Sequence, residues 1–423
     1  MPHRVKSLIM VMGLLLALPG VLIMPGVLCI TPFAVLSGER NALSYGLFSF
    51  VGAALTLGAG GVTFWHSRRS MQNKPSRPLR LPSAWLMALI FGLLVAAGIA
   101  IREGRIAEGL FFPPLLIAAA GLPPLLAVAW FTRQEDEGLT RRRGMVAFAG
   151  GATVGVLIAI VLEILLPVIV FTLVRGLSDV VVRYGGRLLD ALAGRNVASA
   201  FANPAFVYLF VQLALIAPLA EEFAKPLVTL PLIGHLSRRE AFLVAAMAGA
   251  GFAAMENVLY ASLGLYLWSG ILVVRALGGA IHPLGAGLVG LSWHGILKSE
   301  PRAWSKGIAR FALAAGVHAI WNGGSLIVIT LAGARFFGPL PPQINLLGLS
   351  AAGTTLALLV VLGLAAMWLG RTLVQRSGLP GESTSEPVQA QFALSDRAVA
   401  IWALACLAAI VPAGITSLQL LVQ

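Results

Sequence analysis

The chain has 423 residues, of which 58% are hydrophobic and only 11% are charged, and its mean hydropathy is +0.89. A soluble domain carries about 25% charged residues, so this composition excludes an ordinary soluble enzyme and also a disordered chain. A net charge of +13 in a soluble protein would suggest nucleic acid. Here the basic residues lie in short segments between apolar stretches, which favours a role in membrane orientation and predicts no nucleic-acid partner.

Apolar segments long enough to cross a bilayer recur along the whole chain. They predict an all-α, polytopic integral membrane bundle of about eleven transmembrane helices. The expected spans lie near 8–33, 43–65, 83–101, 109–131, 144–173, 204–234, 241–268, 270–297, 308–333, 344–370 and 398–421. Most Lys and Arg residues fall on one side when these spans alternate, which predicts a multi-pass protein of the cell membrane with a cytoplasmic N-terminus.

Two connections between the spans are unusual. Residues 176–199 place charged residues on one helix face, which is typical of an amphipathic helix on the outer leaflet or of a solvated connector helix. Residues 377–397 are rich in Ser, Pro, Gly and Glu and predict a flexible linker.

Few ionisable residues are expected at membrane depth, and most of these fall in four consecutive spans between positions 204 and 333. A charge inside the bilayer costs several kcal/mol, so such residues are functional candidates. At about 1.5 Å per residue, the four candidates lie roughly 15–22 Å from the cytoplasmic ends of their spans. They are Glu222, Glu256, His282 and His318. Their matched depths predict a single buried polar site.

The first motif in these spans is an E-E-x-x-K pattern formed by Glu221, Glu222 and Lys225. Lys225 follows the two carboxylates by four and three residues, so it can reach either of them on a helix. Two adjacent carboxylates in lipid cannot both ionise cheaply. Pairing of one with Lys225 leaves the other available for general acid or base catalysis.

Three further patterns follow in order. Phe252, Glu256 and Asn257 form an F-x-x-x-E-N pattern, and His318 with Asn322 forms an H-x-x-x-N pattern on one helix face. Arg275 precedes His282 by seven residues and shares its face, which favours a buried counter-ion over a catalyst. Asn322 fits a helix–helix hydrogen bond as well as it fits a catalytic role.

These four patterns, in this order, resemble those of the PrsW family of intramembrane proteases, which looks related to the CAAX-processing and Abi-type membrane proteases. The resemblance covers about residues 204–325, and it can be extended to the span at 144–173. It implies a polytopic enzyme that cleaves membrane-associated proteins, with a membrane-protein substrate in the lipid bilayer. It also implies three parts of the chain: an N-terminal block of about four spans over 1–140, a protease core over 141–335, and a two-span extension over 336–423.

Two catalytic schemes use the same residues. In the first, a divalent metal, most simply zinc, takes ligands from a set of carboxylates and imidazoles while Glu221 serves as base. The predicted ligands are Glu222, Glu256, His282 and His318. In the second, which the related CAAX-type enzymes suggest, Glu221 activates water directly, Lys225 holds Glu222, and His318 with Asn322 stabilises the oxyanion. The resemblance to a group of metalloproteases favours the first scheme.

Two other functions also fit buried Glu, Lys and His residues. A proton- or ion-coupled transporter uses such residues as an ion path, and a non-catalytic scaffold uses them to join helices. The chain shows no convincing internal repeat, and repeated halves are common in secondary transporters. The sequence therefore favours the protease.

Overall fold

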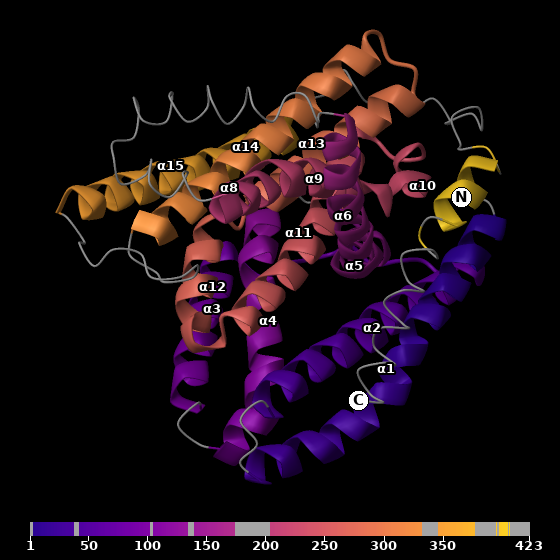
Figure 1. Cartoon of the computed structure of the whole chain (residues 1–423). Coiled ribbons are helices and arrows are strands. Elements are labelled where there is room, and N and C mark those ends of the chain that lie inside the picture. The colour runs from indigo at the N-terminus through magenta and orange to yellow at the C-terminus, as the bar shows by residue number, and fades with distance from the viewer. Residues whose placement is uncertain are drawn as a thin grey trace.

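The computed structural model is built of helices (Figure 1), and it describes residues 3–37, 42–101, 105–133, 139–173, 204–331 and 346–376, with 395, 397–404 and 406. Within these residues there is no β-strand, and one isolated bridge joins Pro78 to Thr140. The predicted amphipathic helix over 176–199 and most of the predicted linker over 377–397 lie outside the described residues.

Four long helices open the chain. They are α1 (His3–Ser37), α2 (Ala42–Met71), α3 (Ala84–Ile101) and α4 (Arg105–Phe131). Helices α1 and α2 form a long hairpin along one side of the molecule (Figure 1). Their backbones approach closely, because a Cβ atom on Gly20 or Gly60 would clash with the backbone of the opposite helix.

Helix α4 continues through four prolines, at positions 113, 114, 123 and 124. The sequence predicts a span over 109–131, and this span contains all four prolines. Proline is tolerated in membrane helices where neighbouring helices satisfy the backbone groups that it frees. Helix α4 packs between α3 and α11, so it has such neighbours on two sides.

The rest of the chain forms shorter and more broken elements. They are α5 (Arg141–Gly150), the π-helix η1 (Gly151–Gly155), α6 (Val156–Leu173), α8 (Pro204–Val211), the π-helix η2 (Gln212–Ile216), α9 (Ala217–Leu227), α10 (Leu230–Ile233), α11 (Arg238–Leu263), the 3₁₀ turn η3 (Leu265–Leu267), α12 (Trp268–Leu277), α13 (Ile281–Leu297), α14 (Ala303–Leu331) and α15 (Leu346–Arg376). Helices α12 and α13 meet at an angle of 44°.

Helix α11 lies at the centre of the bundle and is buried along most of its length. It begins with a capping box in which Ser237 and Glu240 satisfy each other's backbone N–H groups. A Cβ atom on Gly251 would clash with the carbonyl of Phe148 in α5, and one on Gly249 would clash with the carbonyl of His282 in α13. Small residues on α11 therefore let two neighbouring helices approach its backbone.

Eight helices in the described residues are long and apolar enough to cross a membrane, or nine if the bent pair α12–α13 forms one span. These nine coincide with predicted spans. Helix α2 forms over the span predicted at 43–65 but is not among the nine, and the span predicted at 398–421 lies largely outside the described residues. A multi-pass helical membrane protein is thus confirmed, whereas the number eleven, the cell membrane and the cytoplasmic N-terminus stay predictions.

Candidate active site

The charged residues predicted at membrane depth meet inside the bundle, on four neighbouring helices. Helix α9 carries Glu221, Glu222 and Lys225, α11 carries Glu256, α13 carries His282 and α14 carries His318. Each of these side chains is buried, and Glu222, Lys225 and His318 have no exposed surface. The structure therefore brings together residues that lie almost a hundred positions apart in the sequence.

Lys225 links the two adjacent carboxylates of α9. Its Nζ lies 2.6 Å from Oε1 of Glu222 and 3.1 Å from Oε2 of Glu221. The spacings of three and four residues place all three side chains on one face of the helix, as the sequence predicted. The ammonium also lies 4.6 Å from the ring centroid of Phe252, and this cation–π contact offers further stabilisation to the buried charge.

His318 is oriented by the second carboxylate. Its Nδ1–H donates a hydrogen bond of 2.9 Å to Oε1 of Glu222. This bond directs the other ring nitrogen, Nε2, to within 3.8 Å of Oε2 of Glu221. A carboxylate that holds one nitrogen of an imidazole fixes the ring and leaves its second nitrogen free for a ligand.

His282 lies close to a third carboxylate, that of Glu256. Its Nε2 lies 3.1 Å from Oε2 of Glu256, and its Nδ1 lies 3.9 Å from Oε2 of Glu221. Arg275 pairs with the same oxygen of Glu256 at 2.8 Å. Arg275 therefore serves as a counter-ion, as the sequence suggested, although its side chain is partly exposed. The two imidazole rings meet edge to face, with ring centroids 4.6 Å apart.

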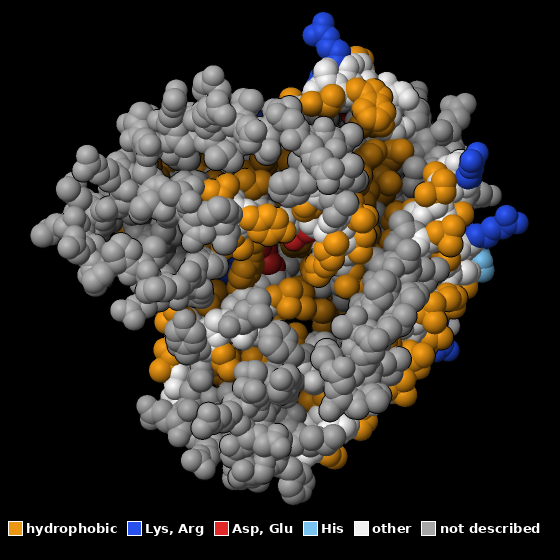
Figure 2. Space-filling model, viewed as in Figure 1, with side chains coloured by type: hydrophobic (Ala, Val, Ile, Leu, Met, Phe, Trp, Pro, Cys, Tyr) orange, Lys and Arg blue, Asp and Glu red, His pale blue; other side chains and the backbone are white. Residues whose placement is uncertain are grey.

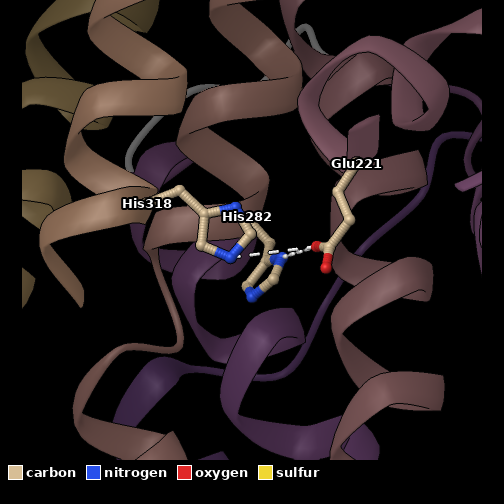
Figure 3. A group of neighbouring side chains, drawn as sticks. All are labelled: Glu221, His282 and His318. Atoms are coloured by element: carbon tan, nitrogen blue, oxygen red, sulfur yellow. Dashed lines mark ion pairs between the residues drawn. The ribbon is translucent and has the colours of Figure 1, made fainter. Parts of the chain in front are cut away.

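Three buried atoms face one another at the centre of this cluster. Nδ1 of His282 and Nε2 of His318 have no hydrogen-bond partner, and Oε2 of Glu221 is paired with the ammonium of Lys225 at 3.1 Å. These side chains converge from α9, α13 and α14 (Figure 3), and each offers one ligand atom within 4.8 Å of the other two. Buried polar atoms without partners are rare. One carboxylate oxygen and two imidazole nitrogens form a donor set that suits a divalent cation such as zinc.

This set differs from the predicted ligands. The sequence placed Glu222 and Glu256 among them, but one oxygen of Glu222 bonds Lys225 and His318, and Glu256 faces Arg275 and His282. Glu221, predicted as the base, takes their place. Spacing along a helix predicts that Lys225 can reach both carboxylates, but it does not tell which of the two faces the unpartnered nitrogens of the histidines.

Within the described residues, no hydrogen bond joins Asn322 to the cluster. Its amide instead donates to the carbonyl of Leu213 in the π-helix η2, at 3.0 Å. A π-helix interrupts the regular backbone hydrogen bonds of an α-helix. The bond from Asn322 holds this interrupted segment, which lies directly before α9, in place. Of the two roles that the sequence allowed, the contact favours the helix–helix hydrogen bond.

Two residues near the cluster received no role from the sequence. A Cβ atom on Gly285 would clash with the carboxylate of Glu222, so a larger residue there would displace this carboxylate from its present position. The sequence could have indicated this glycine, because it lies three residues after His282 and therefore on the same helix face. Asn257 follows Glu256 and binds Arg275 through its side-chain oxygen.

One face of the molecule is hollowed in the region of α6 and α11 (Figure 2). Hydrophobic side chains line this hollow, and acidic side chains are visible at its floor. The hydrophobic rim suits contact with lipid or with an apolar segment of another protein.

Residues 141–341 match a family model described as PrsW family intramembrane metalloprotease. No curated protein and no solved structure matches the chain. The matched segment contains the whole cluster and both histidines with unpartnered ring nitrogens. This segment, residues 141–341, belongs to the PrsW family of intramembrane metalloproteases.

Proposed function

We propose that this chain is an intramembrane endopeptidase that hydrolyses peptide bonds of membrane-associated proteins. The observation that carries the proposal is the convergence of three buried ligand atoms on Glu221, His282 and His318 within a protease-family segment, where the two imidazole nitrogens have no hydrogen-bond partner. Hydrolysis inside a bilayer needs a polar, enclosed place for water, a group that accepts a proton, and a group that stabilises the oxyanion. This cluster offers a carboxylate that can accept a proton and imidazoles that can stabilise an oxyanion, and all of these side chains are buried inside the bundle.

In the metal-dependent form of this proposal, Glu221, His282 and His318 hold a divalent cation, most simply zinc. Such an ion would polarise the scissile carbonyl and acidify a bound water. Glu222 fixes the ring of His318 through Nδ1, and Lys225 balances the charge of the paired carboxylates. Second partners of this kind orient imidazole ligands and strengthen them.

With Glu221 among the ligands, another carboxylate has to accept the proton. Glu256 is the candidate, because its Oε1 is buried and takes no hydrogen bond. In the metal-free form, Oε2 of Glu221 accepts a proton from water directly, and His318, protonated at both ring nitrogens, stabilises the oxyanion through Nε2–H. Both forms depend on the same carboxylate, so Glu221→Gln should abolish cleavage in either.

The test compares wild-type and Glu221→Gln protein expressed in the same membranes. We expect new protein termini, in or next to membrane-spanning segments, only with the wild-type chain. Glu300→Gln is the matched control, since this carboxylate lies in the loop after α13 and contacts His294 instead of the cluster. Equal sets of termini from wild-type and Glu221→Gln membranes would refute the protease.

Elemental analysis of the purified protein separates the two forms. If the donor set holds zinc, the wild-type protein should contain about one ion per chain, and Glu221→Gln should lose most of it because an amide oxygen is a weaker ligand than a carboxylate. Chelation should then stop cleavage, and added zinc should restore it. Active protein without stoichiometric metal would refute the metal-dependent form and leave Glu221 as a direct base.

A further inference from the structure

The second proline pair of α4 leaves one backbone carbonyl without a partner inside the helix. The carbonyl of Ala120 would accept from the N–H of residue 124 in an α-helix, or of residue 123 in a 3₁₀ turn. Both positions are proline and have no N–H. Ala120 is fully buried, so water cannot replace the missing donor.

Asn257 on α11 provides the missing donor. Its amide nitrogen Nδ2 donates to the Ala120 carbonyl at 2.9 Å. Asn257 is itself buried, with 3% of its surface exposed. An amide fixed at one end presents the other end in a set direction. The side-chain oxygen Oδ1 of Asn257 accepts a hydrogen bond from Nε of Arg275.

Arg275 extends this chain of contacts to the candidate site. Its Nη2 lies 2.8 Å from Oε2 of Glu256, and that same oxygen lies 3.1 Å from Nε2 of His282. The guanidinium also lies 4.6 Å from the ring centroid of Tyr260. Asn257, Glu256 and the ring of Tyr260 thus contact the planar guanidinium from three directions. A guanidinium fixed in this way can place a carboxylate accurately.

The break between α12 and α13 explains why such support is needed. Arg275 lies in the last turn of α12, and His282 lies in the first turn of α13. The two helices meet at 44°, so no continuous helix fixes one side chain relative to the other. Side-chain contacts through Glu256 therefore link the position of Arg275 to that of His282.

We propose that the Ala120 carbonyl, freed by Pro123 and Pro124, positions the candidate site through Asn257 and Arg275. These two are positioning residues, since they act on His282 through Glu256. The consequence for metal binding rests on the proposed function. Helix α4 precedes the matched segment 141–341, so the N-terminal block contributes a backbone group to the site that the family match does not include.

The experiment uses the purified full-length chain in five forms: wild-type, Pro124→Ala, Asn257→Ala, the double variant, and Pro114→Ala. Pro124→Ala gives α4 the N–H that bonds the Ala120 carbonyl and so competes with Asn257. Pro114→Ala is the matched control, because it restores an N–H in the same helix next to another proline, but outside this chain of contacts. Two quantities are measured: the ring-nitrogen NMR signals of His282 in metal-free, ¹⁵N-histidine protein, and the affinity for zinc alone by chelator competition.

We expect Asn257→Ala to shift the His282 signals, which a His282→Gln sample identifies, and to weaken zinc binding about ten- to a hundredfold. Pro124→Ala should shift the same signals and weaken binding about three- to tenfold, the range of one hydrogen bond. The double variant should match Asn257→Ala, because both changes break the same contact. Pro114→Ala should match the wild type.

Three results would overturn the proposal. His282 signals that do not move in Asn257→Ala would reject the whole chain of contacts. Signals in Pro124→Ala that match those in Pro114→Ala, or effects that multiply independently in the double variant, would reject the contribution of α4. Coupled shifts of His282 in a protein that binds no zinc would support the positioning and count against the metal-dependent function instead.

Discussion

Substitution of Lys225 by methionine tests the charge balance on which the site depends. The Nζ atom lies 2.6 Å and 3.1 Å from the two carboxylates, and none of the side chain is exposed. With an effective dielectric constant of about 20, each contact is worth about 5–6 kcal/mol of gross attraction. Most of this offsets the cost of burying the ammonium, so the expected loss is the ~3–5 kcal/mol found when one partner of a buried pair is removed.

Thermal unfolding in detergent, together with cleavage, measures this loss. Lys225→Met should unfold several degrees earlier than the wild type and lose activity, whereas Lys306→Met, at an exposed lysine of α14, should change neither. The double variant Lys225→Met, Glu222→Gln should recover part of the stability, because it also removes one uncompensated carboxylate. A single variant that unfolds and cleaves like the wild type would refute the reasoning.

Two other substitutions probe how the helices around the site approach each other. Gly285→Ala places a methyl group against the Glu222 carboxylate and should lower activity at least tenfold; Gly316→Ala, whose Cβ meets nothing within 4 Å, should leave activity unchanged in the same cleavage assay. Asn322→Ala removes the donor to the Leu213 carbonyl and should destabilise the protein by about 1–3 kcal/mol in thermal unfolding while zinc still binds. Loss of cleavage with no loss of stability would instead favour a role at the oxyanion.

Much of the architecture could be predicted because a bilayer allows few solutions. A span needs about 20 apolar residues and must satisfy its own backbone, so hydrophobic length alone located nine of the spans. It could not locate the interruptions. Nothing in the hydrophobic pattern marks the π-helices at 151–155 and 212–216, which continue the regular helices on either side of them.

The site could be predicted as a gathering of residues but not as a set of contacts. Periodicity places Glu221, Glu222 and Lys225 on one face, and matched depth suggests that His282 and His318 meet them. Which oxygen faces which nitrogen depends on the rotation of α9 and on the bend before α13, and both are tertiary properties. For this reason the sequence could not indicate that Glu221, and not Glu222, lies next to the unpartnered nitrogens of the two histidines.

The irregular elements of the fold lie next to the residues of the site. The π-helix η2 leads directly into the E-E-x-x-K segment, η1 packs against α11 near Phe252, and the α12–α13 break comes immediately before His282. Non-helical backbone at membrane depth is tolerated only where protein or a polar cavity surrounds it.

A run of regular, parallel helices would direct these side chains along fixed lines at fixed depths. Breaks let short helical segments rotate independently, so that carboxylates and imidazoles from four helices reach one point, and neighbouring side chains must then hold that arrangement. Asn257, Asn322 and Arg275 occupy such positions, which makes them the residues whose substitution should alter the site without touching a donor atom.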